Sequence, residues 1–171
     1  MAGLRKGHSY SKAIKRPYTR KSKFKNKSYV KAVPISKIVK YDMGDLKKEF
    51  PRKVHLVTNE DVQLRHNAVE SARVIINRHM HELLGQNYRL KLRQYPHHVL
   101  RENKMLTGAG ADRMQSGMQQ AFGSPTGIAI QAKKGCKLFT AYVENDGIEK
   151  AKKAFSSGRA RLPKTYSIII E

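Results

Sequence analysis

The feature that most restricts how this chain can fold is the distribution of its charge. Residues 1–40 contain thirteen lysines and arginines and no acidic residue, and the first carboxylate is that of Asp42. This stretch also lacks an apolar period that could give a helix or strand a buried face. We therefore expect residues 41–171 to form one domain and residues 1–40 to form a basic extension, a division that suits a chain of 171 residues.

The excess charge points to a polyanionic partner. A net charge of +22 repels itself in a compact fold unless counter-charge is supplied. A membrane surface is also anionic, but no segment approaches the roughly 18 apolar residues of a span, and none has the form of a secretion signal. We therefore expect a cytosolic protein that binds nucleic acid. The single cysteine, Cys136, can form neither an internal disulfide nor a multi-cysteine zinc site.

Aromatic residues are interleaved with the cations of the extension. Phosphates can neutralise the lysines and arginines, while the rings can stack on bases or ribose. We expect an arm that folds on RNA; the alternative is a solvated, disordered cationic tail. The candidate RNA contacts of the extension are Lys15, Arg16, Tyr18, Arg20, Lys21, Lys23 and Lys25.

The first half of the domain predicts strands around a long helix. Residues 38–41 can form a short strand and residues 54–58 a longer one. The helix is expected to begin after a cap at Thr58 or Asn59 and to end at Gly85. Its apolar stripe recurs at steps of three, four and seven residues and comprises Val62, Val69, Ala72, Ile76, Met80 and Leu83.

Two groups of cations in this half can face outward. Arg65 and Arg73 border the stripe, and their guanidinium groups can meet either RNA or only Glu70 and solvent. Residues 88–95 alternate, with Tyr88, Leu90 and Leu92 on one face and Arg89, Lys91 and Arg93 on the other. Successive cations of such a strand lie about 6.5–7 Å apart, which suits phosphates along one RNA strand. A solvated polar face is the alternative.

The segment from His97 to Gly127 has neither a helical period nor strict alternation. A connection of this length inside a compact domain is usually functional or disordered. Its glycines permit unusual backbone conformations and close approaches, and it carries the cations Arg101, Lys104 and Arg113 beside Met105, Met114, Met118 and Phe122. We interpret residues 103–126 as an inserted loop that packs against a polyanion; a mobile surface insertion is the alternative.

The second half of the domain predicts two strands, a helix and a terminal strand, at residues 127–132, 137–143, 145–157 and 165–170. A turn at Lys134 and Gly135 should join the first two strands as a hairpin. Asp146 and Glu149 have the spacing of a capping box, and Gly158 should follow the helix. The isoleucines of the last strand indicate that it is mostly covered. The expected fold class is α+β, a mainly antiparallel sheet with two helices on one side.

The sequence contains no recognisable enzyme or cofactor motif. Glu102 and Asp112 are the carboxylates of the loop, whereas a two-metal site needs a converging cluster of acids. The histidines of His79–His81 and His97–His98 are not spaced to meet at one ion without a distant third ligand, so we expect structural or RNA-contacting roles. Gly108–Gly110 lacks the rest of a dinucleotide or phosphate-loop fingerprint. We predict no catalytic residue, metal or cofactor.

Several stretches closely resemble one family. They are KRPYTRK at residues 15–21, QLRHNAVE at 63–70, YPHHVLRENKM at 95–105, TGAGADR at 107–113, GM at 117–118 and AFG at 121–123. Together they are similar to large-subunit ribosomal protein ten-e of archaea and eukaryotes, the counterpart of bacterial large-subunit protein sixteen. The resemblance covers most of the chain. The chain lacks the additional C-terminal segment of eukaryotic members, which favours an archaeal member.

The resemblance implies that the globular part packs on large-subunit ribosomal RNA and that the loop reaches toward the peptidyl transferase centre and the tRNA sites. Its implied role is to support tRNA placement and subunit maturation, with tRNA and neighbouring ribosomal proteins as further partners and no homo-oligomer. It adds His66, His97, His98, Arg101 and Lys104 to the RNA contacts. The implied tRNA-site loop comprises Thr107, Gly108, Ala109, Gly110, Ala111, Asp112, Arg113, Met114, Gly117 and Met118. The chain departs from the family pattern at Gln119, Gln120 and Ser124, which makes this end of the loop less cationic.

A non-ribosomal RNA-binding protein or a ribosome-assembly factor would share the charge and the arm. Stoichiometric copurification with large subunits through a high-salt wash separates these alternatives, because a transient factor should leave.

Overall fold

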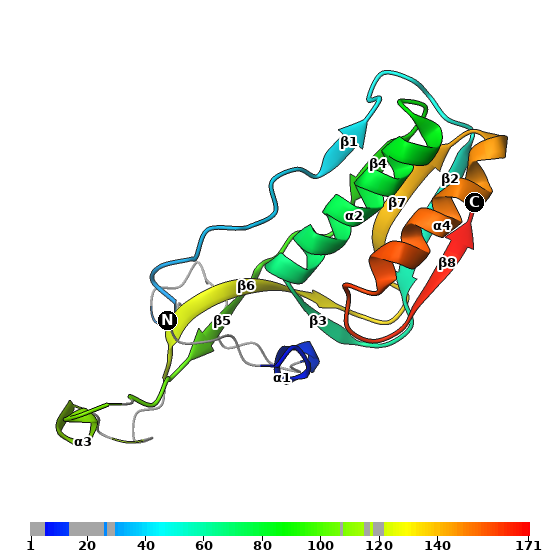
Figure 1. The fold of residues 1–171 in the computed structure, drawn as a ribbon. Helices are drawn as coiled ribbons and strands as arrows, with labels where there is room; N and C mark the ends of the chain where they lie inside the picture. The colour runs from blue at the N-terminus through cyan, green and yellow to red at the C-terminus, as the bar shows by residue number, and fades with distance from the viewer. Residues whose placement is uncertain (1–5, 14–25, 27–29, 107, 115–116, 118–121) are drawn as a thin grey trace.

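The computed structural model describes residues 6–13, 26, 30–106, 108–114, 117 and 122–171. In chain order its elements are α1 (His8–Ser11), β1 (Asp42–Gly44), β2 (Arg52–Thr58), β3 (Val62–Arg65), α2 (His66–Leu84), β4 (Arg89–Leu92), β5 (His98–Glu102), α3 (Ala111–Met114), β6 (Ser124–Ala132), β7 (Lys137–Val143), the 3-10 turn η2 (Asn145–Gly147), α4 (Ile148–Arg159) and β8 (Tyr166–Ile170). The long helices α2 and α4 lie side by side over one face of the larger sheet (Figure 1). The predicted α+β class is confirmed.

The strands form two antiparallel sheets, whereas the sequence predicted one. The five-stranded sheet has the order β1-β4-β7-β2-β8 and the three-stranded sheet the order β3-β6-β5. The predicted hairpin of β6 and β7 is therefore wrong, because these consecutive strands belong to different sheets. The turn between them exists, but the Thr58 hydroxyl at the end of β2 donates to the Lys133 carbonyl oxygen at 2.7 Å. This contact anchors the turn beside β2, with which β7 then pairs.

The predicted start of the long helix is also wrong. Residues 62–65 form β3 and pair with β6, which satisfies their backbone groups outside a helix. Val62 lies seven residues before Val69, so a buried strand residue happens to continue the helical stripe. The rest of the stripe is confirmed, with Val69, Ala72, Ile76 and Met80 buried. Gly85 follows the helix with a φ of 61°, whereas Leu83 is 39% exposed, contrary to expectation.

The first strand is displaced from its predicted position. β1 covers residues 42–44 rather than 38–41, although the Leu92 amide already donates to the Tyr41 carbonyl oxygen at 2.8 Å. Gly44 has a φ of 84°, and a Cβ on it would lie 2.1 Å from the Tyr88 carbonyl oxygen. Glycine therefore allows β1 to approach β4 this closely. The strands predicted at 54–58 and 137–143 and the buried face of Tyr88, Leu90 and Leu92 are confirmed.

Helix α4 begins without the predicted capping box. Gly147 occupies the N-cap position after η2, and no side chain caps the helix. Gly158 lies inside the helix rather than after it, and a Cβ there would lie 2.3 Å from Ile76 Cγ1. This glycine lets α4 pack closely on α2. The buried side is confirmed for Ala151, Ala154 and Phe155.

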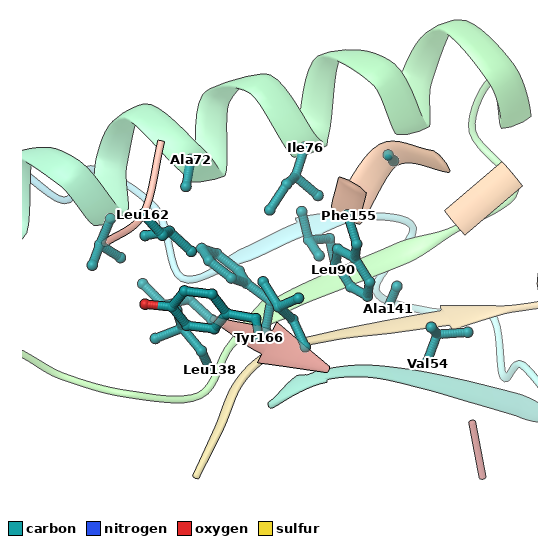
Figure 2. Close-up of a cluster of buried hydrophobic side chains, with 14 of the residues drawn as sticks. Val54, Ala72, Ile76, Leu90, Leu138, Ala141, Phe155, Leu162 and Tyr166 are labelled. Carbon is teal, nitrogen blue, oxygen red and sulfur yellow. The ribbon is translucent and has the colours of Figure 1, made fainter. Parts of the chain in front are cut away.

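The main hydrophobic core fills the space between the two helices and the five-stranded sheet. Figure 2 shows side chains from both layers meeting there, among them Ile76, Phe155 and Leu90. The edge strand β8 pairs with β2 alone. Ile169 and Ile170 are consequently 44% and 42% exposed, so this strand is less covered than predicted.

The start of the extension is packed on the domain. Helix α1 contacts β3, and the Gln63 side-chain amide donates to the Tyr10 carbonyl oxygen at 2.6 Å. Residues 6–13 of the basic extension are therefore packed on the domain. Among the described residues, none of the helices is both long enough and apolar enough to cross a membrane.

Candidate nucleic-acid interface

Two strands carry the inserted loop away from the main core. β5 and β6 pair antiparallel from His98 with Ala129 to Glu102 with Ser124. Figure 1 shows this pair running out beyond α2, with the short helix α3 beyond its far end. The register shifts between Leu100 and Arg101, and such an irregularity increases the local bend and twist of a strand pair. The loop therefore lies at the tip of a curved hairpin.

A close backbone contact defines the base of the loop. A Cβ on Gly123 would lie 2.3 Å from the backbone carbonyl carbon of Glu102, so the two chains can approach this closely because residue 123 is glycine. Beside this contact, the Arg101 guanidinium carbon lies 3.7 Å from the centroid of the Phe122 ring. Arg101, a predicted RNA contact, is thus held by a cation–π interaction within the protein.

The described part of the loop exposes cations beside apolar side chains. Lys104 and Arg113 are exposed, as are Met105 and Met114. Of the predicted tRNA-site residues, the structure describes Gly108, Ala109, Gly110, Ala111, Asp112, Arg113, Met114 and Gly117, while Thr107 and Met118 lie outside the described residues. Positive φ angles at Gly108, Gly110 and Gly117 favour glycine at these positions. A surface of this composition can contact both phosphates and bases.

Three predicted RNA contacts meet where α2 begins. Arg65, His66 and Lys104 line a cavity of about 250 Å³, together with Lys37 and Glu102. The Arg65 guanidinium carbon lies 4.1 Å from the centroid of the Tyr10 ring, which orients this side chain. Cations outnumber the one carboxylate here, so the cavity suits an anionic group.

The histidines of the interface are in different environments. Burial lowers the pKa of His66, and the charges of Lys37 and Arg65 lower it further. Burial also lowers the pKa of His98, with a smaller contribution from Arg101. Both imidazoles are therefore mainly neutral near pH 7. His97, by contrast, is exposed and lies 4.7 Å from Tyr95, measured between ring centroids.

Arg73 points toward the protein rather than outward. It is 9% exposed, and its Nη2 and Nε donate to the two Glu70 carboxylate oxygens at 2.6 and 2.8 Å. These bonds contribute most to lowering the pKa of Glu70. Of the two roles considered for Arg73, the structure places it on Glu70.

The cations of β4 face away from the helices, as the alternation predicted. Arg89 and Lys91 lie 3.4 and 3.9 Å from the same Asp42 carboxylate oxygen, and Arg93 is exposed just beyond the strand. Arg89 also lies 5.5 Å from the centroid of the Tyr142 ring. Asp42 therefore partly neutralises the row, which the sequence did not indicate because β1 comes beside β4 only in the folded sheet.

Some predicted contacts lie outside the described residues, namely Lys15, Arg16, Tyr18, Arg20, Lys21, Lys23 and Lys25. Within the described ranges, no group of three or more histidine, cysteine, aspartate or glutamate side chains is placed to hold a metal ion. Lys37 and Tyr142 were not predicted individually as members of the interface. Charge and aromatic character were the available signals, and long-range packing decides their positions.

Comparison with known proteins identifies close relatives. The family model described as ribosomal protein L16p/L10e matches residues 14–169. The large ribosomal subunit protein uL16 of Methanospirillum hungatei is 46% identical over 170 residues, which cover 98% of this chain and 96% of that protein. The uL16 proteins of Staphylothermus marinus and Archaeoglobus fulgidus are 42% and 41% identical, over 98% and 92% of this chain and 94% and 88% of their own lengths.

Proposed function

Because the chain belongs to the ribosomal protein L16p/L10e family, we propose that it binds the RNA of the large ribosomal subunit and extends residues 103–126 toward the peptidyl transferase centre and the tRNA sites. Its role there is structural: it supports tRNA placement and subunit maturation, while RNA performs the chemistry. Ribosomal RNA, tRNA and neighbouring ribosomal proteins are its partners in this proposal.

The observation that carries the proposal is the placement of a cationic loop at the end of a long hairpin. Lys104 and Arg113 are exposed on this loop, and α3, which carries Arg113, lies remote from α2 and α4 (Figure 1). A loop on this support can reach a distant site while the domain stays bound to RNA elsewhere. The positive charge of the loop suits the phosphates of tRNA or ribosomal RNA.

The remaining cations supply anchorage in this proposal. Residues 1–40 neutralise phosphates along the extension, and the domain of residues 41–171 adds Arg65 and His66 at the start of α2. Electrostatic contacts of this kind dominate affinity for nucleic acid and weaken as salt rises. The proposal therefore assigns binding mainly to the extension and domain, and the effect on tRNA mainly to the loop.

A double variant tests this division. Lys104→Ala with Arg113→Ala should reduce tRNA binding and peptide-bond formation by reconstituted large subunits more than it reduces incorporation of the protein. The matched control is Lys150→Ala with Lys153→Ala, which removes the same charge from exposed positions of α4. An equal loss of incorporation and activity in the loop variant would contradict the division.

Retention through a high-salt wash tests the ribosomal assignment itself. A constituent should remain at one copy per large subunit, measured by quantitative mass spectrometry, whereas an assembly factor should be depleted from mature particles.

A further inference from the structure

The five-stranded sheet has a second face that the helices leave open (Figure 1). On this face Tyr142 of β7 is the register partner of Arg89 on β4 and of Lys53 on β2. Neighbouring strands lie about 4.8 Å apart, so the ring has one cation on each side. Neither the motifs nor the apolar periodicity of the sequence indicated this arrangement.

The side chains of this trio are available to a ligand. Lys53 is exposed, and among the described residues its ammonium group makes no ion pair or hydrogen bond. Arg89 is 3.4 Å from Asp42 and 5.5 Å from the Tyr142 centroid, and the second distance is near the outer limit of about 6 Å for a cation–π contact. These contacts position Arg89 loosely, and a phosphate can replace them.

The charge of the face is not uniform. Arg89 and Lys91 follow one another on β4 and Arg93 lies just beyond it, with Asp42 as the carboxylate near Arg89 and Lys91. Toward β8 the balance changes, because Glu171 contacts both Lys137 and the buried His55. The cationic surface therefore ends beyond β2, and Tyr142 is the aromatic ring placed within it.

We infer that this face binds an unpaired nucleotide of ribosomal RNA, with its base stacked on Tyr142 and its flanking phosphates near Arg89 and Lys53. The inference rests on the proposed function and adds a site that the function does not require. Single-stranded RNA is recognised on open sheets by aromatic rings that stack on bases and by cations that contact the backbone. An acidic protein segment would use the cations but would have no need for a ring between them.

A binding experiment with the full chain tests the inference. The probe is a fluorescein-labelled twelve-residue oligouridine, and its affinity is measured by fluorescence anisotropy. Tyr142→Leu should weaken binding about five-fold or more, because one stacked base is lost. Tyr142→Phe keeps the ring and should remain within about two-fold of the original affinity. Thermal unfolding followed by circular dichroism shows whether each variant is folded.

A lysine pair provides a second test that leaves the half-buried tyrosine in place. Lys53→Ala should weaken binding about three-fold and reduce its salt dependence. Lys153→Ala removes the same charge from α4, on the helix-covered side, and should change the affinity less than two-fold. Binding by the original chain with unchanged affinity in both Tyr142→Leu and Lys53→Ala would overturn the site alone. Failure of the original chain to bind RNA would overturn the proposed function as well.

Crosslinking in assembled large subunits identifies the occupant. Irradiation at 254 nm, nuclease digestion and mass spectrometry should recover the Tyr142 peptide with an attached nucleotide. Recovery of this peptide attached to another polypeptide, or without any adduct, would overturn the inference.

Discussion

The two sheets of this protein differ in how far they are packed into the main hydrophobic core. Around the five-stranded sheet, α2 and α4 bury a continuous core that includes Ile76, Leu90 and Phe155. The three-stranded sheet joins this core at one end, through Ile130 and Ala132 of β6. Farther along, Val30, Val99 and Ile128 form a separate small cluster. The five-stranded sheet is thus packed in the larger hydrophobic core, whereas the three-stranded sheet carries the loop.

This difference shows how a small domain can hold a loop at a distance from its main core. Stability is unevenly distributed in proteins, and segments with few buried apolar contacts open at lower free-energy cost. Where the loop begins, the hairpin of β5 and β6 depends on local contacts, namely the approach of Gly123 to Glu102 and the stacking of Arg101 on Phe122. We therefore expect the free energy of global unfolding to depend mainly on the five-stranded sheet with α2 and α4. The position of the loop should depend on the three-stranded sheet.

The largest expected effect comes from truncating a phenylalanine in each region. Phe155 is fully buried, so Phe155→Ala should lower the free energy of unfolding by about 3–5 kcal/mol. Phe122 is 55% exposed, so Phe122→Ala should lower it by less than about 1 kcal/mol, the scale of its contact with Arg101. Urea unfolding followed by circular dichroism measures both. Equal losses of unfolding free energy in the two variants would show that both regions contribute equally to global stability.

Local patterns in the sequence predicted the parts of the fold that depend on neighbouring residues. Leu90 and Leu92 alternate with cations within one strand, and Ile76 and Met80 recur along one helix, so β4 and the body of α2 were predicted correctly. The partner of β7 was not, because the turn at residues 134–135 has the local signal of a hairpin. Thr58, 75 residues from Lys133, anchors this turn beside β2 of the five-stranded sheet, whereas β6 belongs to the three-stranded sheet.

The same distinction applies to the candidate interface. Charge and glycine content marked the loop and the cations of β4, since both are properties of the sequence itself. The orientation of Arg73 toward Glu70 was one of two alternatives that local spacing could not separate. The position of Tyr142 between Arg89 and Lys53 depends on pairing among three strands that are distant in the chain.

A glycine substitution should produce the next largest effect, concentrated in the hairpin. Gly123→Ala places a Cβ against the Glu102 backbone, so the two strands must separate, at a cost of about 1–3 kcal/mol. Hydrogen exchange should accelerate in β5 and at the start of β6 but not in α2. Gly7→Ala is the control, because no atom lies within 4 Å of its added Cβ. Faster exchange throughout α2 would show that the hairpin and the core are one cooperative unit.

A smaller effect is expected from the stacked pair at the loop base. Arg101→Lys keeps the charge but loses the flat guanidinium group over Phe122. In a double-mutant cycle with Phe122→Leu, the coupling energy should be about 0.5–1 kcal/mol. Urea unfolding of the four proteins supplies the cycle. A coupling energy near zero would mean that the two side chains do not hold the base of the loop together.

The last and smallest effect is a difference in the pH at which amide exchange accelerates, between β5 with the start of α2 and the edge strand β8. Burial lowers the folded-state pKa of His66 and His98 below 6.5, so their stabilising contribution is present above pH 6.5 and is lost as the pH falls toward the folded-state pKa values. Glu171 behaves differently, because hydrogen bonds from Lys137 and His55 lower its pKa from 4.5 to about 2. Its contribution is present above pH 4.5 and is lost between pH 4.5 and 2.

On acidification, amides of β5 and the start of α2 should therefore exchange faster before those of β8, once the intrinsic pH dependence of exchange is removed. His98→Gln should shift the onset in β5 to lower pH, whereas His97→Gln, at an exposed histidine, should not. Loosening of β8 at or above the pH at which β5 loosens would reverse the expected order. It would mean that the ionised contact at the sheet edge, rather than the buried histidines of α2 and β5, limits the stability of the fold in mild acid.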